Sequence, residues 1–267
     1  MSLPTIVSFW HGPMSWLERL SIASFIARGH RVEVYSYDAI DGFPPDATRR
    51  DAAEILPADQ LIFYKGKGTP GVFSDRFRLC LLKAGRGLYS DLDVYCHRPF
   101  ADLPDYVMGY ERPGSVNNAV LAIPADAPLL DDLLSVFNAT GRPLLEPHLP
   151  LGRRLEVAAR RLLGDPVPPE HMQFGATGPF ALTHFMTQRR LLAKVQPQPV
   201  FYPIAYEGIP ALMQSGSSID TAIRPETLAV HLWRSQLTDR GRAGLPAPAP
   251  DSALAELCRK ERIPFAE

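Results

Sequence analysis

The sequence predicts an α/β fold built on a parallel sheet. "TIVSFW" (5–10) reads as an apolar strand, and "RVEVYSYD" (31–38) alternates as a second strand after a helical pattern. A strand, a helix and a strand within about 30 residues are typical of a parallel sheet, whose ligands lie beyond the carboxyl ends of its strands. The 267 residues, 46% of them hydrophobic, suffice for one large α/β core.

Local signals define the elements between and after these strands. Ser15 and Glu18 form a capping box at the start of the first helix, and Gly29 closes that helix. The Pro- and Asp-rich stretch 41–59 is expected to be a loop, and "QLIFY" (60–64) a short strand.

A capped helix then leads into "GLYSDLDVY" (87–95), read as a buried strand. Ser74 is the expected N-cap, and Gly87 follows the helix end. In an extended strand alternate residues share a face, so Asp91 and Asp93 stand together and repel each other. Mg²⁺ or Mn²⁺ would turn this repulsion into attraction and would leave coordination positions for substrate phosphates.

The second half of the chain completes one domain over 1–243. A helical insertion is expected at about 140–175, and a linker with a short helix at 244–267. Strands are expected at 106–111, 118–124, 200–204 and 228–233, with helices near 127–137 and after the Gly-Pro turn in 175–186.

Charge and cysteine content argue against a nucleic-acid-binding protein and against an exported one. Formal net charge is −1, from 28 Lys+Arg against 29 Asp+Glu, which gives no drive toward nucleic acid. Three cysteines without C-x-x-C spacing favour a reducing cytoplasm, and no targeting segment or membrane span is recognisable. The arginines at 153–161 are read as a solvated helix face, or alternatively as a peripheral contact with the inner face of a membrane or with an acidic acceptor.

The stretch "SDRFRLCLLKAGRGLYSDLDVY" (74–95) resembles the sugar-binding D-x-D glycosyltransferases. These include bacterial and fungal mannosyl- and galactosyltransferase-like proteins and, more distantly, the catalytic domains of clostridial glucosylating toxins. The family pattern is S-D-x-x-R, an apolar helix, then G-G-x-Y-x-D-x-D; here one glycine is displaced, as "GRGLY". Further matches follow in order at "SFWHG" (8–12), "VYSYD" (34–38), "NNAVLAIPADAPLL" (117–130), "GATGPFALT" (175–183) and "AVHLW" (229–233).

The resemblance implies a GT-A fold, a Rossmann-like mixed sheet flanked by helices, and a retaining hexosyltransferase of polysaccharide or glycolipid synthesis. It implies Mn²⁺ or Mg²⁺ and a nucleotide-sugar donor, with a UDP-sugar favoured over a GDP-sugar. Its implied sugar contacts are Asp75, Arg78, Asp91 and Asn118; its nucleotide contacts are Trp10, Asp38, Ser74, Tyr89 and Asp91; its metal ligands are Asp91, Asp93 and His231.

Other interpretations stay open. Trp10 could cap the core, His231 could be a hydrogen-bonded core histidine, and Asn118 could be a turn residue at a strand end. A haloacid-dehalogenase-type phosphatase also uses D-x-D, with the first aspartate as nucleophile, but it needs a downstream lysine, and Lys194 is the only one between 84 and 259. A non-catalytic protein that binds nucleotide sugars or glycans is the third alternative.

Overall fold

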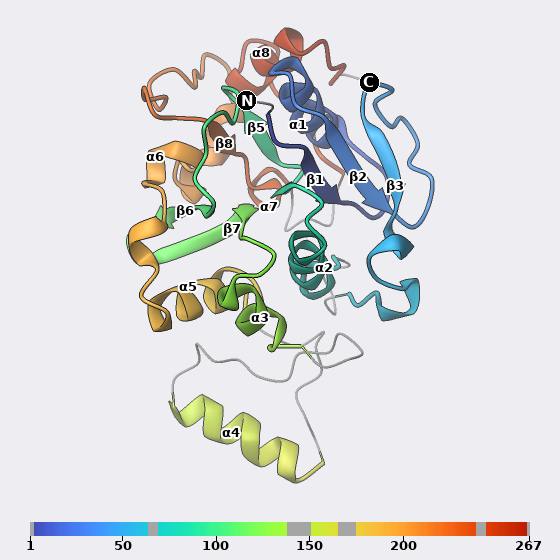
Figure 1. Cartoon of the computed structure of the whole chain (residues 1–267). Coiled ribbons are helices and arrows are strands. Elements are labelled where there is room, and N and C mark those ends of the chain that lie inside the picture. The colour runs from blue at the N-terminus through green and yellow to red at the C-terminus, as the bar shows by residue number, and fades with distance from the viewer. Residues whose placement is uncertain (1–2, 64–68, 138–150, 165–174, 239–243, 266–267) are drawn as a thin grey trace.

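A computed structural model of the chain describes residues 3–63, 69–137, 151–164, 175–238 and 244–265. Its centre is a six-stranded mixed sheet of order β3-β2-β1-β4-β7-β6, flanked by helices (Figure 1). A smaller sheet pairs β5 with β8. The strands are β1 (Ile6–Phe9), β2 (Val32–Ser36), β3 (Thr48–Asp51), β4 (Leu88–Ser90), β5 (Val94–Cys96), β6 (Val107–Arg112), β7 (Ser115–Ala122) and β8 (Ala229–His231).

The helices cover both faces of the main sheet. Side chains alternate along β1, so Ile6 packs in one hydrophobic cluster with α1 and α8, whereas Val7 and Phe9 pack in another with α2, α3 and α5. The helices are α1 (Trp16–Ala27), α2 (Gly71–Lys83), α3 (Pro128–Leu134), α4 (Leu151–Leu162), α5 (Pro179–Gln188), α6 (Gln198–Phe201), α7 (Arg234–Leu237) and α8 (Ala253–Lys260). This arrangement confirms the predicted α/β class with a mixed sheet flanked by helices, and it is compatible with a Rossmann-like fold.

Strand direction decides which loops meet. Strand β1 is parallel to both β2 and β4, whereas β7 is antiparallel to β4 and β6. The carboxyl ends of β1, β2 and β4 therefore lie at the same edge of the sheet. Trp10 follows β1, Asp38 follows β2 and Asp91 follows β4, so three predicted site residues emerge at this edge.

Several local predictions hold and others are wrong. The capping box of Ser15 and Glu18 is formed at the start of α1. The predicted loop 41–59 contains strand β3, which the sequence pattern misses because its polar side chains line an exposed sheet edge. The predicted strand 60–64 is absent from its described part, 60–63, because Gln60 ends a 3₁₀ turn.

Two further boundaries need correction. Helix α2 begins at Gly71, so Ser74 lies inside the first turns and is not the N-cap. The predicted strand 200–204 is instead the end of α6 and the coil after it, although Phe201 and Tyr202 are buried as expected. A short buried apolar run does not distinguish a strand from a helical turn.

The acidic strand is also not continuous. Strand β4 ends at Ser90, the chain turns at Leu92 and Asp93, and β5 begins at Val94 in the smaller sheet. Asp91 and Asp93 therefore lie in the connection between two sheets. Their proximity comes from this turn and not from the side-chain alternation of a single strand.

The predicted insertion at 140–175 is described only in part. Helix α4 lies within it, and 140–150 and 165–174 lie outside the described residues. Over the described ranges, no helix has both the length and the apolar character needed to cross a bilayer.

The glycines before β4 have different roles. Gly87 has φ +151°, and a Cβ there would lie 2.3 Å from the Thr5 carbonyl oxygen. That oxygen accepts the Leu88 N–H at 2.9 Å, so β4 meets β1 through a close backbone approach. Gly85 has φ +63° with open space around its missing Cβ.

We expect Gly87→Ala to lower the free energy of unfolding by about 3 kcal/mol, because it combines an unfavourable φ with a backbone clash. Gly85→Ala is the matched control and should cost only about 1 kcal/mol, for the left-handed backbone alone. Urea unfolding of both variants measures the difference. Equal losses would show that the β1–β4 approach does not constrain position 87.

Candidate functional site

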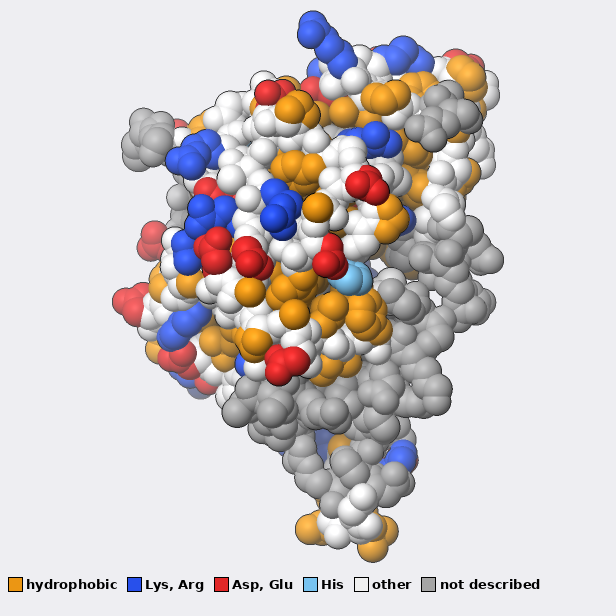
Figure 2. Space-filling model, turned by 90° about the vertical axis from the view of Figure 1, so that its right-hand side faces the viewer, with side chains coloured by type: hydrophobic (Ala, Val, Ile, Leu, Met, Phe, Trp, Pro, Cys, Tyr) orange, Lys and Arg blue, Asp and Glu red, His pale blue; other side chains and the backbone are white. Residues whose placement is uncertain are grey.

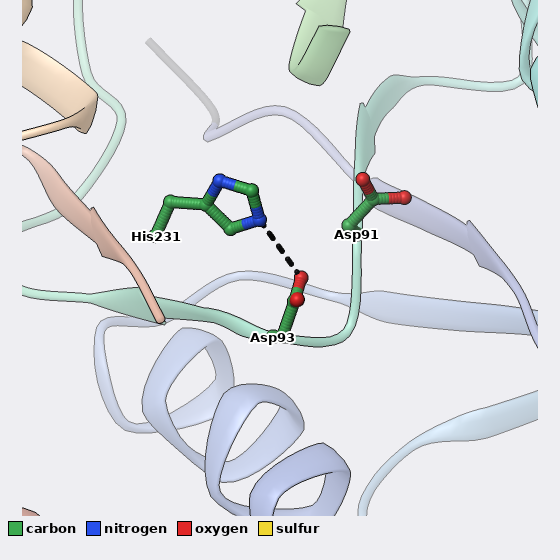
Figure 3. A group of neighbouring side chains, drawn as sticks. All are labelled: Asp91, Asp93 and His231. Carbon is green, nitrogen blue, oxygen red and sulfur yellow. Dashed lines mark hydrogen bonds and ion pairs between the residues drawn. The ribbon is translucent and has the colours of Figure 1, made fainter. Parts of the chain in front are cut away.

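The connection between β4 and β5 brings two carboxylates and an imidazole together (Figure 3). One potential ligand atom from each of Asp91, Asp93 and His231 lies within 4.8 Å of the others. His231 Nε2 lies 3.2 Å from Asp93 Oδ1. Both aspartates are half-buried and His231 is buried, so a cation here would bind partly within the protein.

Strand pairing explains how residues so distant in sequence meet. In the antiparallel pair of β5 and β8, Val94 lies opposite His231, and Asp93 immediately precedes this pair. The Asp93 carbonyl accepts the Leu232 N–H at 2.7 Å, which continues the pairing by one step. His231 thus lies beside the second aspartate through backbone hydrogen bonds of the smaller sheet.

The backbone after β8 also holds Asp93. The Arg234 N–H donates to Asp93 Oδ2 at 2.8 Å. Trp233 has a left-handed backbone, φ 37° and ψ 81°, which is uncommon for a residue with a large side chain. Its ring packs against the His231 imidazole, with centroids 4.3 Å apart. The strained residue therefore orients both the imidazole and the N–H that Asp93 accepts.

The two carboxyl groups have pKa values shifted in opposite directions. Burial, together with the charge of Asp93, raises the pKa of Asp91 despite the neighbouring Arg78. Burial also acts on Asp93, but His231 and the Arg234 N–H outweigh it and lower the pKa of Asp93. The pair thus resists carrying two negative charges without a further cation.

This donor set fits a divalent cation. Two carboxylates are hard ligands suited to Mg²⁺ and Mn²⁺, and an imidazole adds a nitrogen donor. His231 Nδ1 is buried and has no hydrogen-bond partner within the described parts of the chain. Three protein ligands would leave positions open on a six-coordinate ion.

Arg78 is the central cation behind this group. Its side chain is 6% exposed, and its Nη2 and Nη1 lie 3.1 and 3.3 Å from the two oxygens of Asp91. It also donates to the Asn118 carbonyl at 2.7 Å and lies over the Tyr89 ring. Burial lowers the pKa of Arg78, but Asp91 and its other anionic neighbours outweigh this and raise it, so the guanidinium stays charged.

Tyr89 and Ser74 complete this network. Burial raises the pKa of the Tyr89 hydroxyl, which stays protonated and donates to Asp91 Oδ1 at 2.9 Å. Arg78 Nη2 donates to Ser74 Oγ at 3.3 Å. Asp91 is therefore fixed by a guanidinium fork and a phenol before any ligand binds.

Asp75 lies deeper in the protein, against β7 and the start of α5. Its Oδ1 accepts from Asn118 Nδ2 at 2.9 Å and its Oδ2 from Thr177 Oγ1 at 2.8 Å. A Cβ on Gly178 would lie 2.7 Å from Asp75 Oδ1, so only glycine allows this approach. The space around these groups is about 10 Å³, the size of one water, so both predicted sugar contacts face each other in a pocket too small for a sugar.

A larger cavity opens beside the carboxyl ends of β1 and β2. Its volume is about 230 Å³, many times the roughly 10–15 Å³ that one water needs. Trp10 is half-buried and Asp38 exposed on its wall, together with Ser36 and Asp41. It offers an aromatic ring and carboxylates to a planar polar ligand.

Arg234 connects this cavity with the acidic group. Its guanidinium carbon lies 6.0 Å from the centre of the Trp10 ring, whereas its backbone N–H binds Asp93. Nε lies 3.1 Å from Glu18 Oε1, and the buried Nη1 has no hydrogen-bond partner among the described residues. A cation with unused donor capacity therefore lies between the carboxylates and the cavity.

The structure brings the predicted site residues together in two groups and a cavity wall. Asp91, Asp93 and His231 form the first group, Trp10 and Asp38 line the cavity, and Ser74, Asp75, Arg78, Tyr89 and Asn118 form the buried network. The sequence-based prediction of site residues missed Thr177, Gly178, Trp233 and Arg234. The Thr-Gly-Pro turn was an available signal for the first two residues, and the cation directly after "HLW" was a signal for Arg234.

Comparison with known proteins assigns no family to this geometry. No protein-family model matches the chain, and no curated protein matches it in sequence. A functional interpretation therefore depends on the residues described above and on the motif resemblance of 74–95.

We expect Arg78→Gln to lower the free energy of unfolding by about 3–5 kcal/mol, because it leaves buried carboxylates without their cation. Arg76→Gln is the matched control on the same helix; Arg76 bonds Gln60 and should cost less than about 1 kcal/mol. Adding Asp91→Asn to Arg78→Gln should recover part of the loss. Denaturant unfolding measures all three, and a small Arg78 effect would contradict the role of the buried charge.

Proposed function

We propose that this chain is a metal-dependent glycosyltransferase that moves a sugar from a nucleotide-sugar donor to a glycan, glycolipid or similar acceptor. One observation carries the proposal: Asp91, Asp93 and His231 converge after the carboxyl end of β4, and Arg234 connects them with a cavity lined by Trp10 and Asp38. A diphosphate between a nucleoside and a sugar needs this combination of a divalent cation and a neighbouring planar binding surface.

Asp93 and His231 would be direct ligands of Mn²⁺ or Mg²⁺, and Asp91 would orient the ion from its fixed position on Arg78 and Tyr89. When bound, the ion neutralises the negative charge that grows on the departing phosphate oxygens. The Arg234 guanidinium, whose Nη1 has no hydrogen-bond partner among the described residues, would bind the same diphosphate, because a guanidinium fork suits phosphate oxygens. Trp10 offers its ring face to the base.

The sugar would lie on the side of the cation that faces Arg78. Asp75 and Asn118 bind each other in a pocket of about 10 Å³, so a sugar hydroxyl would have to enter that network to contact them. The GT-A fold, retention of anomeric configuration, transfer of a hexose and preference for UDP over GDP come from the motif resemblance alone, and they stay predictions.

The phosphatase alternative fits this geometry less well. A nucleophilic first aspartate needs an oxygen free to attack phosphorus, but both oxygens of Asp91 receive hydrogen bonds from Arg78 or Tyr89. Lys194, the downstream lysine that such an enzyme needs, lies over the Tyr106 ring beside β6. Neither residue is arranged for a phosphoryl-enzyme.

We expect Mn²⁺ to stimulate release of nucleoside diphosphate when the chain is incubated with UDP- and GDP-sugars. Asp93→Ala should reduce this release at least about 100-fold, because it removes a metal ligand and not a core side chain. Asp131→Ala is the matched control; this exposed aspartate pairs with Lys83 and should leave release unchanged. Circular dichroism checks that both variants are folded.

The outcomes separate the alternatives. Undiminished turnover in folded Asp93→Ala would contradict the metal assignment. Nucleotide binding without Mn²⁺ dependence or donor turnover, seen by calorimetry, would instead favour a non-catalytic binding protein. Release of inorganic phosphate from phosphomonoesters, lost in Asp91→Asn, would favour the phosphatase.

We expect Arg234→Gln to weaken binding of UDP by about tenfold and binding of uridine by less than about twofold, because the guanidinium would contact the diphosphate. Trp10→Ala should weaken both ligands by a similar factor, because the ring would contact the base. Calorimetry in Mn²⁺ measures the four affinities, and Arg234→Lys, which keeps the charge beside Glu18, controls for stability. Equal losses for UDP and uridine in Arg234→Gln would contradict the phosphate contact.

A further inference from the structure

The most exposed large hydrophobic side chains that the structure describes gather in and just after α4. Leu151 is 69% exposed, Leu155 61%, Leu162 88% and Leu163 84%. Elsewhere in the described ranges, no large hydrophobic side chain is more than 40% exposed. Scattered exposed leucines are ordinary, whereas a cluster on one helix indicates a contact surface.

Three of these leucines form one stripe along α4. Positions 151, 155 and 162 fall within about 40° of one another around a helix, since each residue turns it by about 100°. Exposed Ala158 lies beside the stripe. Val157 and Arg160, about opposite to it, are half-buried. The apolar face of α4 is therefore the exposed one, the reverse of the usual orientation of an amphipathic helix on a core.

The helix is also basic. Residues 151–162 contain four arginines and one glutamate, a formal charge of +3 (4 − 1), although the whole chain has −1. Figure 1 places α4 at the end of the molecule farthest from α8, and Figure 2 shows hydrophobic side chains at that same end. An apolar stripe and a concentrated positive charge thus share one projecting helix.

We propose that α4 binds the surface of an anionic lipid bilayer, lying in the plane of the interface. A helix with a leucine face, an arginine-rich polar face and low overall hydrophobicity has the chemistry of an interfacial helix. Leu151, Leu155 and Leu162 enter the boundary of the acyl chains, and exposed Arg154, beside the stripe, lies among the negative head groups. This binding goes beyond the proposed transferase activity and does not depend on it.

Charge decides between a bilayer and a second copy of the chain. Two α4 stripes packed on each other would bring together two helices of charge +3, and like charges in contact are unfavourable. An anionic bilayer covers the same leucines and attracts the arginines. It satisfies both features of the helix at once.

The test is cosedimentation of the full chain with vesicles of phosphatidylcholine alone or with about 30% phosphatidylglycerol. We expect binding to the anionic vesicles, little to the neutral ones, and a clear decrease at high salt. Leu155→Ser and Leu162→Ser should each lower the partition coefficient roughly five- to tenfold. Arg154→Gln should lower it roughly three- to fivefold.

Matched variants outside α4 control for side-chain type. Phe63→Ser removes an exposed apolar side chain and Arg31→Gln an exposed arginine, and both should bind vesicles as the unchanged chain does. Equal binding to neutral vesicles, or full binding by the leucine variants, would overturn the proposal. A dimer that forms in solution without lipid and that Leu155→Ser converts to monomer would overturn the proposal too, because the leucine stripe would then be an interface between two copies of the chain.

Discussion

The burial of one guanidinium among carboxylates constrains the centre of this protein. Arg78 enters from α2 and joins Asp75 on its own helix, Asp91 after β4 and the backbone of Asn118 on β7. Each of these groups would be costly to bury alone, and together they compensate. The same charge that stabilises the packing of α2 on the sheet therefore fixes the first aspartate of the acidic pair in one orientation.

Because of the turn after β4, the two aspartates of the acidic pair are held by different sheets. Asp91 stays with the main sheet, whereas Asp93 leaves with β5 and is held by β8 through His231 and by the Arg234 N–H. The cation that we propose would thus join the two sheets at the point where the chain passes between them. The cavity at Trp10 lies at the edge of the main sheet, and the Arg234 guanidinium extends to the Trp10 ring from the start of α7, just after β8.

The first helix and the first two strands could be predicted from the sequence because their signals are local. The capping box at Ser15 and the apolar alternation of β1 and β2 depend on neighbours in sequence, and so they were readable. Edge strand β3 carries no apolar signal, and α2 begins at Gly71 without a side-chain cap, so neither boundary was visible. The contact of Thr177 with Asp75 joins residues 102 positions apart, and no single-sequence pattern encodes it. The acidic pair itself was found for an incomplete reason, because a turn and not alternation brings it together.

The left-handed backbone of Trp233 has a thermodynamic consequence. A tryptophan at φ 37° costs free energy that the rest of the fold must offset, and part of that compensation is the bond between the next N–H and Asp93. Relaxing the peptide would turn this donor away from the carboxylate. A ligand that binds the Asp93 carboxylate would therefore change the conformational stability of the segment after β8. By thermodynamic reciprocity, the conformation of that segment would change the affinity of Asp93 for the ligand by the same factor.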